Sequence, residues 1–500
     1  MRHYRNRYYK EWEKLSGKSE QTNATELSEE IAPAEVKTQV VPQSLITQFK
    51  KRFQNVEDLS NTTFQHIQLD MYYFEYLVTK EILQDRLKEF RHVTKEEIDQ
   101  YLRESSFKEL PTFNEIEYSI FQGNAILFYQ EQVYELPVKD GESRAVAPSE
   151  TETAIVGPHD AFVESVETNL SLIRKRMNTT NLKSIKLEVG TTAKRTVFLL
   201  YVEDLVSKED IDYITKQIKS VQNDGIVDMN MLVQLIDEHP HSPFPQYYIT
   251  ERPDVSVYKL FDGKIVGLLQ SSPHAFCTPA SFFDFLESID DFGQRWLIGT
   301  SIKILRYIAI LITLFFTPIY VSVTTFHYEM IPQPLLPTLL ESRSKVPFPP
   351  IIEALFLEFL LEMLREAGAR LPTKIGQTIG IVGGIVVGQA AVEAGITSNI
   401  LIIVVAASAI ASFVVPNYLM SASIRIVRFA FIFLAGFWGN IGIIFGFGLL
   451  VVHLTSITNL RFPYLLPVSP MYKRFWKYSI FRGPLRKKKM KKQRQMSDVK

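Results

Sequence analysis

Residues 307–326 read YIAILITLFFTPIYVSVTTF, twenty positions without a formal charge. As a helix, this length is sufficient to cross a hydrocarbon core about 30 Å thick. Asp, Glu, Lys and Arg are also absent from 375–392, 394–424 and 429–460. Because a water-soluble fold has no use for so many uncharged residues in succession, we expect a helical membrane domain over 300–460.

The charges of the chain are unevenly placed, although its 500 residues sum to a formal net charge of zero. Residues 473–500 contain twelve Lys or Arg and one acid, Asp498, which gives +11. Directly after a membrane helix, such a segment favours anionic lipid or the cytoplasmic side over nucleic acid. We therefore predict a basic cytoplasmic tail over 461–500 and no nucleic-acid partner. Residues 1–10 lack the apolar stretch of a signal peptide, which predicts a cytoplasmic N-terminus.

The part before the membrane domain divides into three segments by composition. Residues 1–43 are polar and short of aromatic residues, which is typical of a flexible arm. Residues 44–140 carry apolar residues at helical spacing, such as Phe49 and Phe53, and predict a mainly helical subdomain. Residues 150–295 predict an α/β subdomain.

Local signals predict four elements of this α/β subdomain. Asp160 is expected to cap a helix with an apolar stripe. Two strands are expected over 185–189 and 196–202. Ser207, with Asp210 three residues later, resembles a capping box that opens another helix.

A β-hairpin is expected further along, where 255–258 and 265–268 flank the turn signal Asp262-Gly263. The predicted fold class is therefore multi-domain. N-terminal cytoplasmic α and α/β subdomains precede a polytopic α-helical membrane domain.

The number of membrane crossings should be even, because both termini are expected inside. Six crossings result if 350–364 spans the bilayer and 429–460 is a hairpin that turns near 436–440. Four result if 350–364 lies in the interface and 425–456 is one long tilted helix. Two short basic connections favour six, because both are expected inside: Arg365, Arg370 and Lys374 form one, and Arg425 with Arg428 the other.

Four glycines at spacing four mark one apolar helix: Gly376, Gly380, Gly384 and Gly388. Small residues at this spacing allow another helix to approach closely. The partner helix is expected either in the same chain or in another subunit of a homo-oligomer, and the glycines do not distinguish the two.

Polar side chains within the apolar region are candidates for an ion pathway, because such groups usually face a bundle interior or water. The alternative is structural, with Glu362 paired to Arg365 one turn later. The candidates are Glu353, Glu358, Glu362, Gln389 and Glu393.

No catalytic signature is present: the sequence lacks GxxxxGK[ST], HExxH, GxSxG and GxGxxG. Its single cysteine, Cys277, leaves no cysteine-based zinc site. We expect no enzyme, no metal and no cofactor.

Several stretches resemble the A subunits of the GerA-type spore germination receptor family, in the family's order and over about 150–465. They are NLSLIRKR (169–176), ERPD (251–254), FHYEMIP (326–332), VPFP (346–349), REAG (365–368), GQTIGIVG (376–383), GQAA (388–391) and SFVVP (412–416).

The resemblance implies a multi-pass protein of the spore inner membrane, with both termini on the core side, that responds to nutrients. It implies transporter-like B subunits and lipoprotein C subunits as partners, and an oligomeric, ligand-gated ion channel. A nonconducting membrane signalling scaffold is the alternative. A second alternative is the A-like paralogue associated with the spore dipicolinate channel. It stays open because residues 270–273 are QSSP where the family commonly has DGSP.

Overall fold

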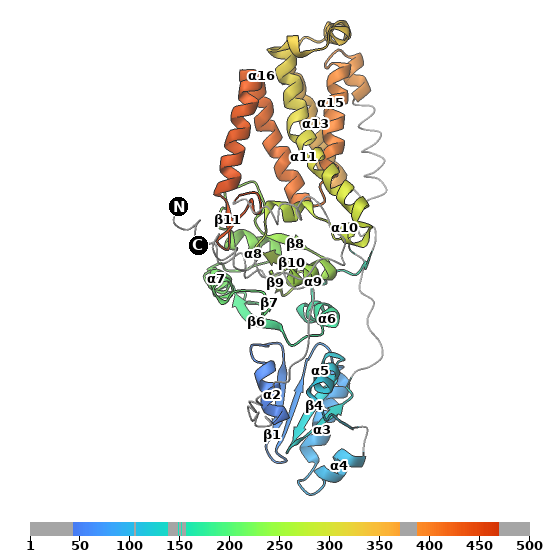
Figure 1. The fold of residues 1–500 in the computed structure, drawn as a ribbon, viewed down its shortest axis with the longest axis vertical. Helices are drawn as coiled ribbons and strands as arrows, with labels where there is room; N and C mark the ends of the chain where they lie inside the picture. The colour runs from blue at the N-terminus through green and yellow to red at the C-terminus, as the bar shows by residue number, and fades with distance from the viewer. Residues whose placement is uncertain are drawn as a thin grey trace, which may run out of the picture. The chain divides into compact units, whose positions relative to one another are not determined.

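The computed structural model describes residues 44–104, 107–138, 149, 152, 157–370 and 388–469 (Figure 1). Its first repeat (residues 45–138) is built on a five-stranded antiparallel sheet of spatial order β1-β2-β4-β5-β3. The strands are β1 (Ser60–Phe64), β2 (Leu69–Tyr73), β3 (Lys108–Glu109), β4 (Ala125–Tyr129) and β5 (Gln132–Leu136). The helices are α2 (Leu45–Arg52), α3 (Lys80–His92), α4 (Ile98–Glu104) and α5 (Phe113–Phe121).

Both faces of this sheet are buried under helices. Leu127 and Phe128 are neighbours on β4, yet they belong to separate hydrophobic clusters, one with α3 and α4 and the other with α2 and α5. The prediction of a mainly helical subdomain over 44–140 is therefore wrong about the core. A strand that is buried on both faces lacks the alternation of polar and apolar residues by which strands are recognised.

The second repeat (residues 166–278) has a sheet of order β6-β7-β9-β10-β8, also antiparallel. Its strands are β6 (Leu182–Val189), β7 (Arg195–Val202), β8 (Tyr248–Thr250), β9 (Ile265–Leu269) and β10 (Ala275–Thr278). Its helices are α6 (Val166–Arg176), α7 (Lys208–Lys219), α8 (Met229–Ile236) and α9 (Pro253–Phe261). The two strands predicted over 185–189 and 196–202 are confirmed as β6 and β7.

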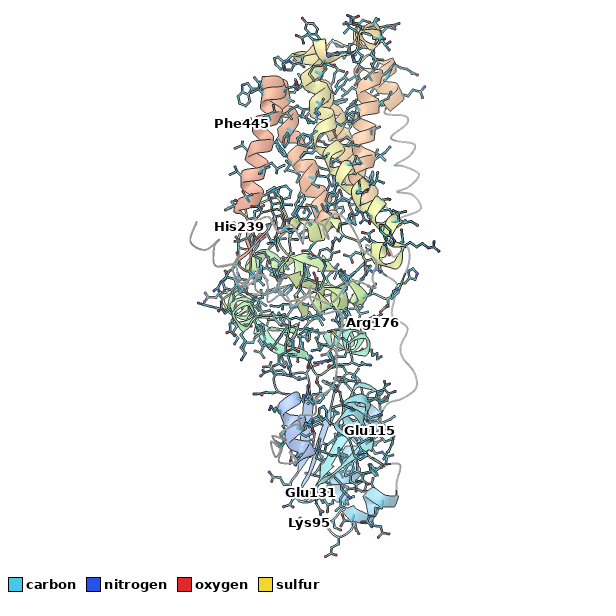
Figure 2. The ribbon with its side chains drawn as sticks, in the orientation of Figure 1. Lys95, Glu115, Glu131, Arg176, His239 and Phe445 are labelled. Carbon is cyan, nitrogen blue, oxygen red and sulfur yellow. The ribbon has the colours of Figure 1, made fainter. Side chains whose placement is uncertain are left out.

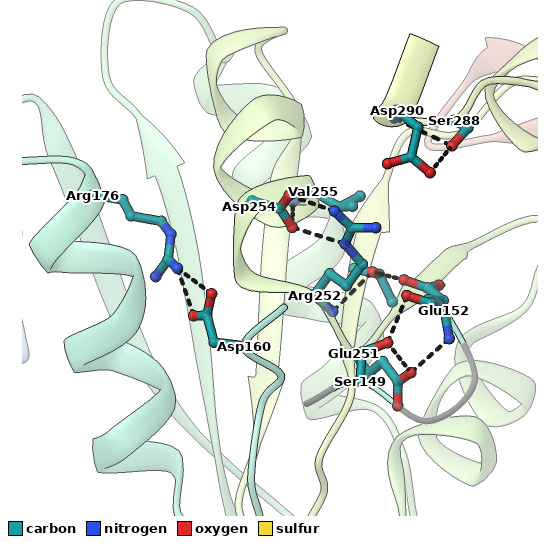
Figure 3. A network of polar contacts seen from close by, with 11 residues as sticks. Ser149, Glu152, Asp160, Arg176, Glu251, Arg252, Asp254, Val255, Ser288 and Asp290 are labelled. Carbon is teal, nitrogen blue, oxygen red and sulfur yellow. Dashed lines mark hydrogen bonds and ion pairs between the residues drawn. The ribbon is translucent and has the colours of Figure 1, made fainter. Parts of the chain in front are cut away.

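The helix caps of this repeat follow the sequence signals only in part. Ser207 caps α7 as predicted, because its side chain accepts a bond from the Asp210 N–H. The predicted Asp160 cap is wrong: Ser165 caps α6, and Asp160 instead accepts bonds from Arg176 (Figure 3).

The predicted hairpin over 255–268 is also wrong. Its first half is the helix α9, which begins with Pro253 at a position where a missing N–H costs nothing. Gly263 has a φ of 80° and ends this helix in the left-handed conformation. The β-branched valines of α9 resemble a strand in sequence, but they are buried in the core of the repeat.

The two repeats share one topology, since their sheets have the same strand order when strands are numbered along each repeat. α9 and β9 begin 140 residues after α5 and β4 (253 − 113 and 265 − 125). Both helix-to-strand turns follow the pattern Tyr-x-x-Phe-x-Gly, at 118–123 and 258–263. Gly123 has a φ of 93° and matches Gly263. The part of the chain that precedes the helical bundle is therefore a structural duplication.

A short connection leads to the helical part of the chain. It contains the 3-10 helix η1 (Phe282–Leu286) and α10 (Asp290–Gly293). The helices that follow are α11 (Trp296–Thr325), η2 (Tyr328–Met330), η3 (Gln333–Leu335), α12 (Leu336–Arg343), α13 (Pro350–Arg370), α15 (Asn399–Phe413) and α16 (Tyr418–Ser456), and the short strands are β11 (Thr458–Asn459) and β12 (Phe462–Pro463). α11, α13, α15 and α16 pack side by side as a bundle (Figure 1).

The 39-residue element α16 is two helices joined at Gly439, which has a φ of 59° and a ψ of −141°. A Cβ atom at Gly446 would lie 2.6 Å from the Leu434 side chain. In one straight helix these two positions would be about 18 Å apart, so the chain reverses at Gly439. The predicted hairpin that turns near 436–440 is confirmed, and the alternative of one long helix over 425–456 is wrong.

Connections between the helices gather at two ends of the bundle. At the first end, the Asn399 N–H donates to Ser342 Oγ at 3.0 Å, so the start of α15 lies beside the end of α12. Ser322, near the end of α11, donates to Asn440 at 2.7 Å, just past the turn of α16. These contacts place the α16 turn and the start of α15 at the end of the bundle where α11 finishes.

The second end of the bundle faces the second repeat. There Ser421 donates to the Ser412 carbonyl at 2.9 Å, where α15 passes into α16. His239 of the second repeat lies 3.3 Å from Thr458, directly after α16 (Figure 2). The hairpin of α16 therefore starts and finishes at the same end.

The segment after α16 is built into the second repeat as a strap (residues 457–464). Asn459 is fully buried and accepts a bond from Thr278 Oγ1 at 2.6 Å, while its amide donates to the Gln246 carbonyl at 2.9 Å. Leu460 packs in the hydrophobic core of the second repeat. The end of the last helix is thereby fixed to a domain formed about two hundred residues earlier in the chain.

Candidate functional site

Five charged side chains meet inside the helical bundle, and we refer to them as the glutamate–arginine cluster. α13 contributes Glu358, Glu362 and Arg365, which follow at spacings of four and three and so share one helix face. α16 contributes Arg425 and Arg428 from the first of its two helices. Among the described residues, the partners of these charges are one another and the hydroxyl groups of neighbouring Ser and Thr side chains.

The inner half of the cluster is the pair of Glu358 and Arg428. Both side chains are almost fully buried, at 0% and 1% exposed, and the guanidinium Nη2 contacts the carboxylate directly. Thr317 on α11 donates to Glu358 at 2.9 Å, and Arg428 donates to Ser408 on α15 at 2.9 Å. One ion pair thus touches all four long helices of the bundle.

The outer half of the cluster centres on Glu362. Its carboxylate lies 3.0 Å from Arg425 Nε, 3.2 Å from Arg365 Nη1 and 3.6 Å from Arg428 Nη2. The pairing of Glu362 with Arg365, raised from the sequence as the structural alternative, is confirmed. Arg425 and Arg428 were expected only as an inside connection, and their i, i+3 spacing in an otherwise uncharged stretch was the signal for a buried role.

Glu353 lies apart from this cluster, at the first end of the bundle. It is buried, lies 3.3 Å from Arg343 Nη2 and accepts a bond from the Ser398 N–H at 3.2 Å. Ser398 caps α15, and its hydroxyl is 2.9 Å from Tyr320 Oη on α11. Glu353 therefore ties two connections of the bundle together.

Gln389 and Glu393 form a second separate site on a helical stretch over 388–393. Gln389 donates to Glu393 at 3.0 Å, and both side chains are exposed. A Cβ atom at Gly388 would meet nothing within 4 Å, so the described part of this chain has no helix against it. Gly376, Gly380 and Gly384 lie outside the described residues.

Outside the apolar region, salt bridges also fasten α11 to the short connection that precedes it. Lys303 at the start of α11 donates to Glu287 at 2.6 Å, and Arg306 binds Asp291. Burial alone would raise the pKa of Glu287, but the nearby Lys303 and Lys259 outweigh it and lower that pKa. The carboxylate therefore stays ionised at neutral pH and holds α11 in place.

Within the described ranges, no group of three or more His, Cys, Asp or Glu side chains is arranged to hold a metal ion. The candidate residues therefore resolve into three sites: the glutamate–arginine cluster, Glu353 with its loop contacts, and the exposed Gln389–Glu393 pair.

Comparison with known proteins gives consistent matches over most of the chain. Residues 47–494 match the family described as Bacillus/Clostridium GerA spore germination protein. Spore germination protein GerQA of Bacillus cereus is 42% identical over 408 residues, which cover 78% of this chain and 82% of that protein. GerIA of Bacillus cereus is 42% identical over 387 residues, 77% of this chain and 58% of that protein. Spore germination protein A1 of Bacillus subtilis (strain 168) is 37% identical over 410 residues, 82% of this chain and 85% of that protein.

Proposed function

Because this chain belongs to the GerA family of spore germination proteins, we propose that it is the A subunit of a receptor that starts germination in response to nutrients. The observation that carries this proposal is the family match over residues 47–494. Spores that lack the chain should lose the response to at least one nutrient, and the wild-type gene should restore it. Unchanged responses to every nutrient that the parent spores detect would contradict the proposal.

The proposed location is the spore inner membrane, crossed six times with both termini on the core side. α11 and α16 are long and apolar enough to span a bilayer, and the α16 hairpin adds a crossing. Phe445 on α16 points away from the bundle, as a lipid-facing side chain would (Figure 2). Arg365 and Arg425, both near the second end of the bundle, agree with an inside position there.

Labelling of single engineered cysteines tests this topology. A cysteine within 395–399 should react with a membrane-impermeant maleimide added from outside, because the start of α15 lies at the first end. A cysteine at Tyr418, which is exposed at the second end, should react only after permeabilisation. The native Cys277 is fully buried and would be replaced by serine in both variants. Protection of 395–399 from outside would refute both the six-crossing and the four-crossing arrangement.

We further propose that the subunit forms a homo-oligomer and works with transporter-like B and lipoprotein C subunits. The open space at Gly388 supports a helix partner from another subunit for the stripe of Gly376, Gly380, Gly384 and Gly388. Replacing Gly388 by leucine should reduce the size of the detergent-solubilised complex, whereas leucine at the exposed Ala390 is the matched control. An unchanged size for the Gly388 variant would contradict a subunit contact there.

Ion conduction is the proposed activity of this oligomer. Of the five candidate residues, Gln389 and Glu393 support it most directly, since an exposed carboxylate in an apolar domain requires water or a polar partner. Glu353, Glu358 and Glu362 are held by arginines, so we propose that they enter the ion path only when those pairs separate. Glu393→Gln should lower ion flux through liposomes that contain the protein, and Glu366→Gln, in an exposed pair with Arg370, should not.

A nonconducting signalling scaffold is the second candidate function. It is favoured by the pairing of Glu358 with Arg428, because a buried carboxylate in an ion pair is suited to holding helices together. Ion flux separates the two functions. Liposomes that contain correctly inserted protein and show no flux with any nutrient tested would favour the scaffold.

A further inference from the structure

The glutamate–arginine cluster contains one more positive charge than negative charge. Arg365, Arg425 and Arg428 share two carboxylates, Glu358 and Glu362. Glu362 alone lies within 3.6 Å of all three guanidinium groups. One cation of the cluster therefore has no counter-charge of its own.

The sequence shows that no other acid of the bundle supplies this missing charge. α11, α15 and α16 contain no Asp or Glu, and none occurs between Glu366 and Glu393. Glu366 accepts a bond from Arg370 at 2.7 Å, one turn along α13 on the exposed surface. Glu353 is paired with Arg343 at the first end of the bundle. The net charge of +1 in the cluster is therefore not balanced by another acid of the bundle.

Hydrogen bonding within the cluster is also incomplete. Arg428 is 1% exposed, and its Nε has no acceptor among the described residues. A buried donor without an acceptor is costly, and an uncompensated charge in an apolar domain costs more. Serines accept one bond each from Arg365, Arg425 and Arg428, but a hydroxyl group supplies no negative charge.

A ligand can reach this site from the second end of the bundle. The side chains of Glu362 and Arg365 are 27% and 15% exposed, whereas Glu358 and Arg428 are closed off. Arg365 also stacks on Phe413, with its guanidinium carbon 4.6 Å from the ring centroid, which holds the planar group in a fixed orientation. A guanidinium group fixed in this way is suited to binding an oxyanion through two N–H groups.

We propose that the glutamate–arginine cluster binds one anionic group at Arg365 and Arg425, either a small inorganic anion or the phosphate of a lipid headgroup. The inference rests on the proposed membrane insertion of the helices, because a low dielectric makes the unpaired charge costly. Its consequence is that the packing of α13 against α16 depends on an anion. Without the anion, three guanidinium groups repel one another and share only two carboxylates, Glu358 and Glu362.

Thermal unfolding of the full-length chain in nanodiscs tests the proposal. The first arm probes the small anion in nanodiscs of neutral phosphatidylcholine. It compares sodium phosphate with sodium gluconate at the same ionic strength. Discs with added phosphatidylglycerol and no phosphate probe the headgroup. At a concentration well above its dissociation constant, the correct anion should raise the midpoint by about 2–4 °C or more. A rise in the first arm alone assigns the small anion, and a rise in the second alone assigns the lipid.

Three variants assign the effect to the cluster. Arg365→Gln balances the charges and should abolish the anion-dependent rise, whereas Arg365→Lys keeps the charge and should retain it. Arg370→Gln, on the same helix but exposed, should behave as wild type. The proposal is overturned if wild type shows no rise in either arm, or if Arg365→Gln retains the full rise.

An alkaline wash separates this failure from failure of the proposed function. A chain that the wash releases from membranes would refute membrane insertion. A chain that stays in the membrane yet shows no response to either probe would refute only the anion site.

Discussion

Arg174 on α6 binds Asp58 of the first repeat through two parallel hydrogen bonds, of 2.9 and 3.1 Å, across 116 residues of sequence. Both side chains are 1% exposed, and Ser184 and Tyr76 donate to the same carboxylate. Backbone bonds of Asn55 and Glu57 with Ser184 run beside the pair. The two repeats are therefore joined by a buried charge pair together with a short stretch of paired backbone.

Asp58→Asn should loosen this joint, because it leaves Arg174 buried without a counter-charge. Breaking a buried pair costs about 3–5 kcal/mol, equivalent to opening that is roughly 200-fold to 5,000-fold more frequent. Hydrogen exchange of the β6 amides in the full-length protein measures that opening. Glu188→Gln, in the exposed pair with Lys194, is the control and should change exchange by less than about fivefold.

The same joint should resist acid to an unusual degree. Burial raises the pKa of Asp58, but the charge of Arg174 and the hydrogen bonds from Arg174, Ser184 and Tyr76 outweigh it, so the folded pKa lies below the ordinary aspartate value of 3.8. Because the pKa of Asp58 is lower in the folded state, its ionised form stabilises the fold fully at pH values above the unfolded pKa of about 3.8. This stabilisation is lost as the pH falls through the folded pKa. Exchange at β6 should therefore be unaffected by Asp58 between pH 5 and 8.

Glu152 should give the opposite pH dependence. Its carboxylate accepts a bond from Thr250 beside Glu251, and burial raises its pKa to about 7 (Figure 3). The folded protein binds more protons than the unfolded chain between pH 4.5 and about 7, so stability falls over that window, by up to about 3 kcal/mol, and then levels.

Thermal midpoints between pH 5 and 8 check this dependence. Glu152→Gln should flatten the decline, and the exposed Glu164→Gln should leave it unchanged. Parallel declines for wild type and Glu152→Gln would show that another group is responsible. The charged groups nearest Glu152 are Glu251, Arg252 and Asp254, so each is a candidate for that role.

The α16 hairpin should depend on one glycine and tolerate change at another. A Cβ atom at Gly442 would lie 2.1 Å from the Leu434 carbonyl oxygen, which is backbone and cannot move aside cheaply. Gly442→Ala should therefore destabilise the solubilised protein by about 1–3 kcal/mol or more. A Cβ atom at Gly448 would have no neighbour within 4 Å, so Gly448→Ala should leave the stability of the protein unchanged or raise it by up to about 1 kcal/mol. Equal midpoints for the two variants would disprove the close packing of the hairpin.

Asn459→Ala should release the strap from the second repeat. The change leaves Thr278 Oγ1, the Ala280 N–H and the Gln246 carbonyl without their partner in a buried site. Each unsatisfied group costs about 1–3 kcal/mol. The rate of protease cleavage within 457–464 should increase at least tenfold. The control variant Thr455→Ala, on the exposed surface of α16, should be cleaved as slowly as wild type.

Signals that depend on local chain geometry were sufficient for part of the fold. Short runs of strand-forming residues identified β6 and β7, and a serine three residues before an aspartate identified the start of α7. The inside placement of the basic connections identified the α16 hairpin. The first sheet was missed because β4 is buried on both faces. α9 was taken for a strand because its valines are typical of strands, although tertiary packing placed them in a helix.

The duplication was missed because its period is not constant. The offset is 140 residues at α5 and α9 but 126 at the starts of β2 and β7 (195 − 69), so a search at one spacing fails. The partners of Glu358 and Glu362 were missed for another reason. Spacing on one helix shows which residues share a face, but it does not show that α16 brings Arg425 and Arg428 to that face.

The strap determines when the second repeat can finish folding during synthesis. Leu460 and Asn459 fill the interior of a domain whose own strands end at Thr278, so that domain is incomplete when the ribosome has finished it. At about 5–20 residues per second, roughly 10–40 s pass before the strap is translated. Throughout that interval the nascent domain has an open core, while, on the proposed topology, the helices enter the bilayer. On the proposed topology, we expect the domain to be completed only after the last helix has been inserted with its end facing the second repeat.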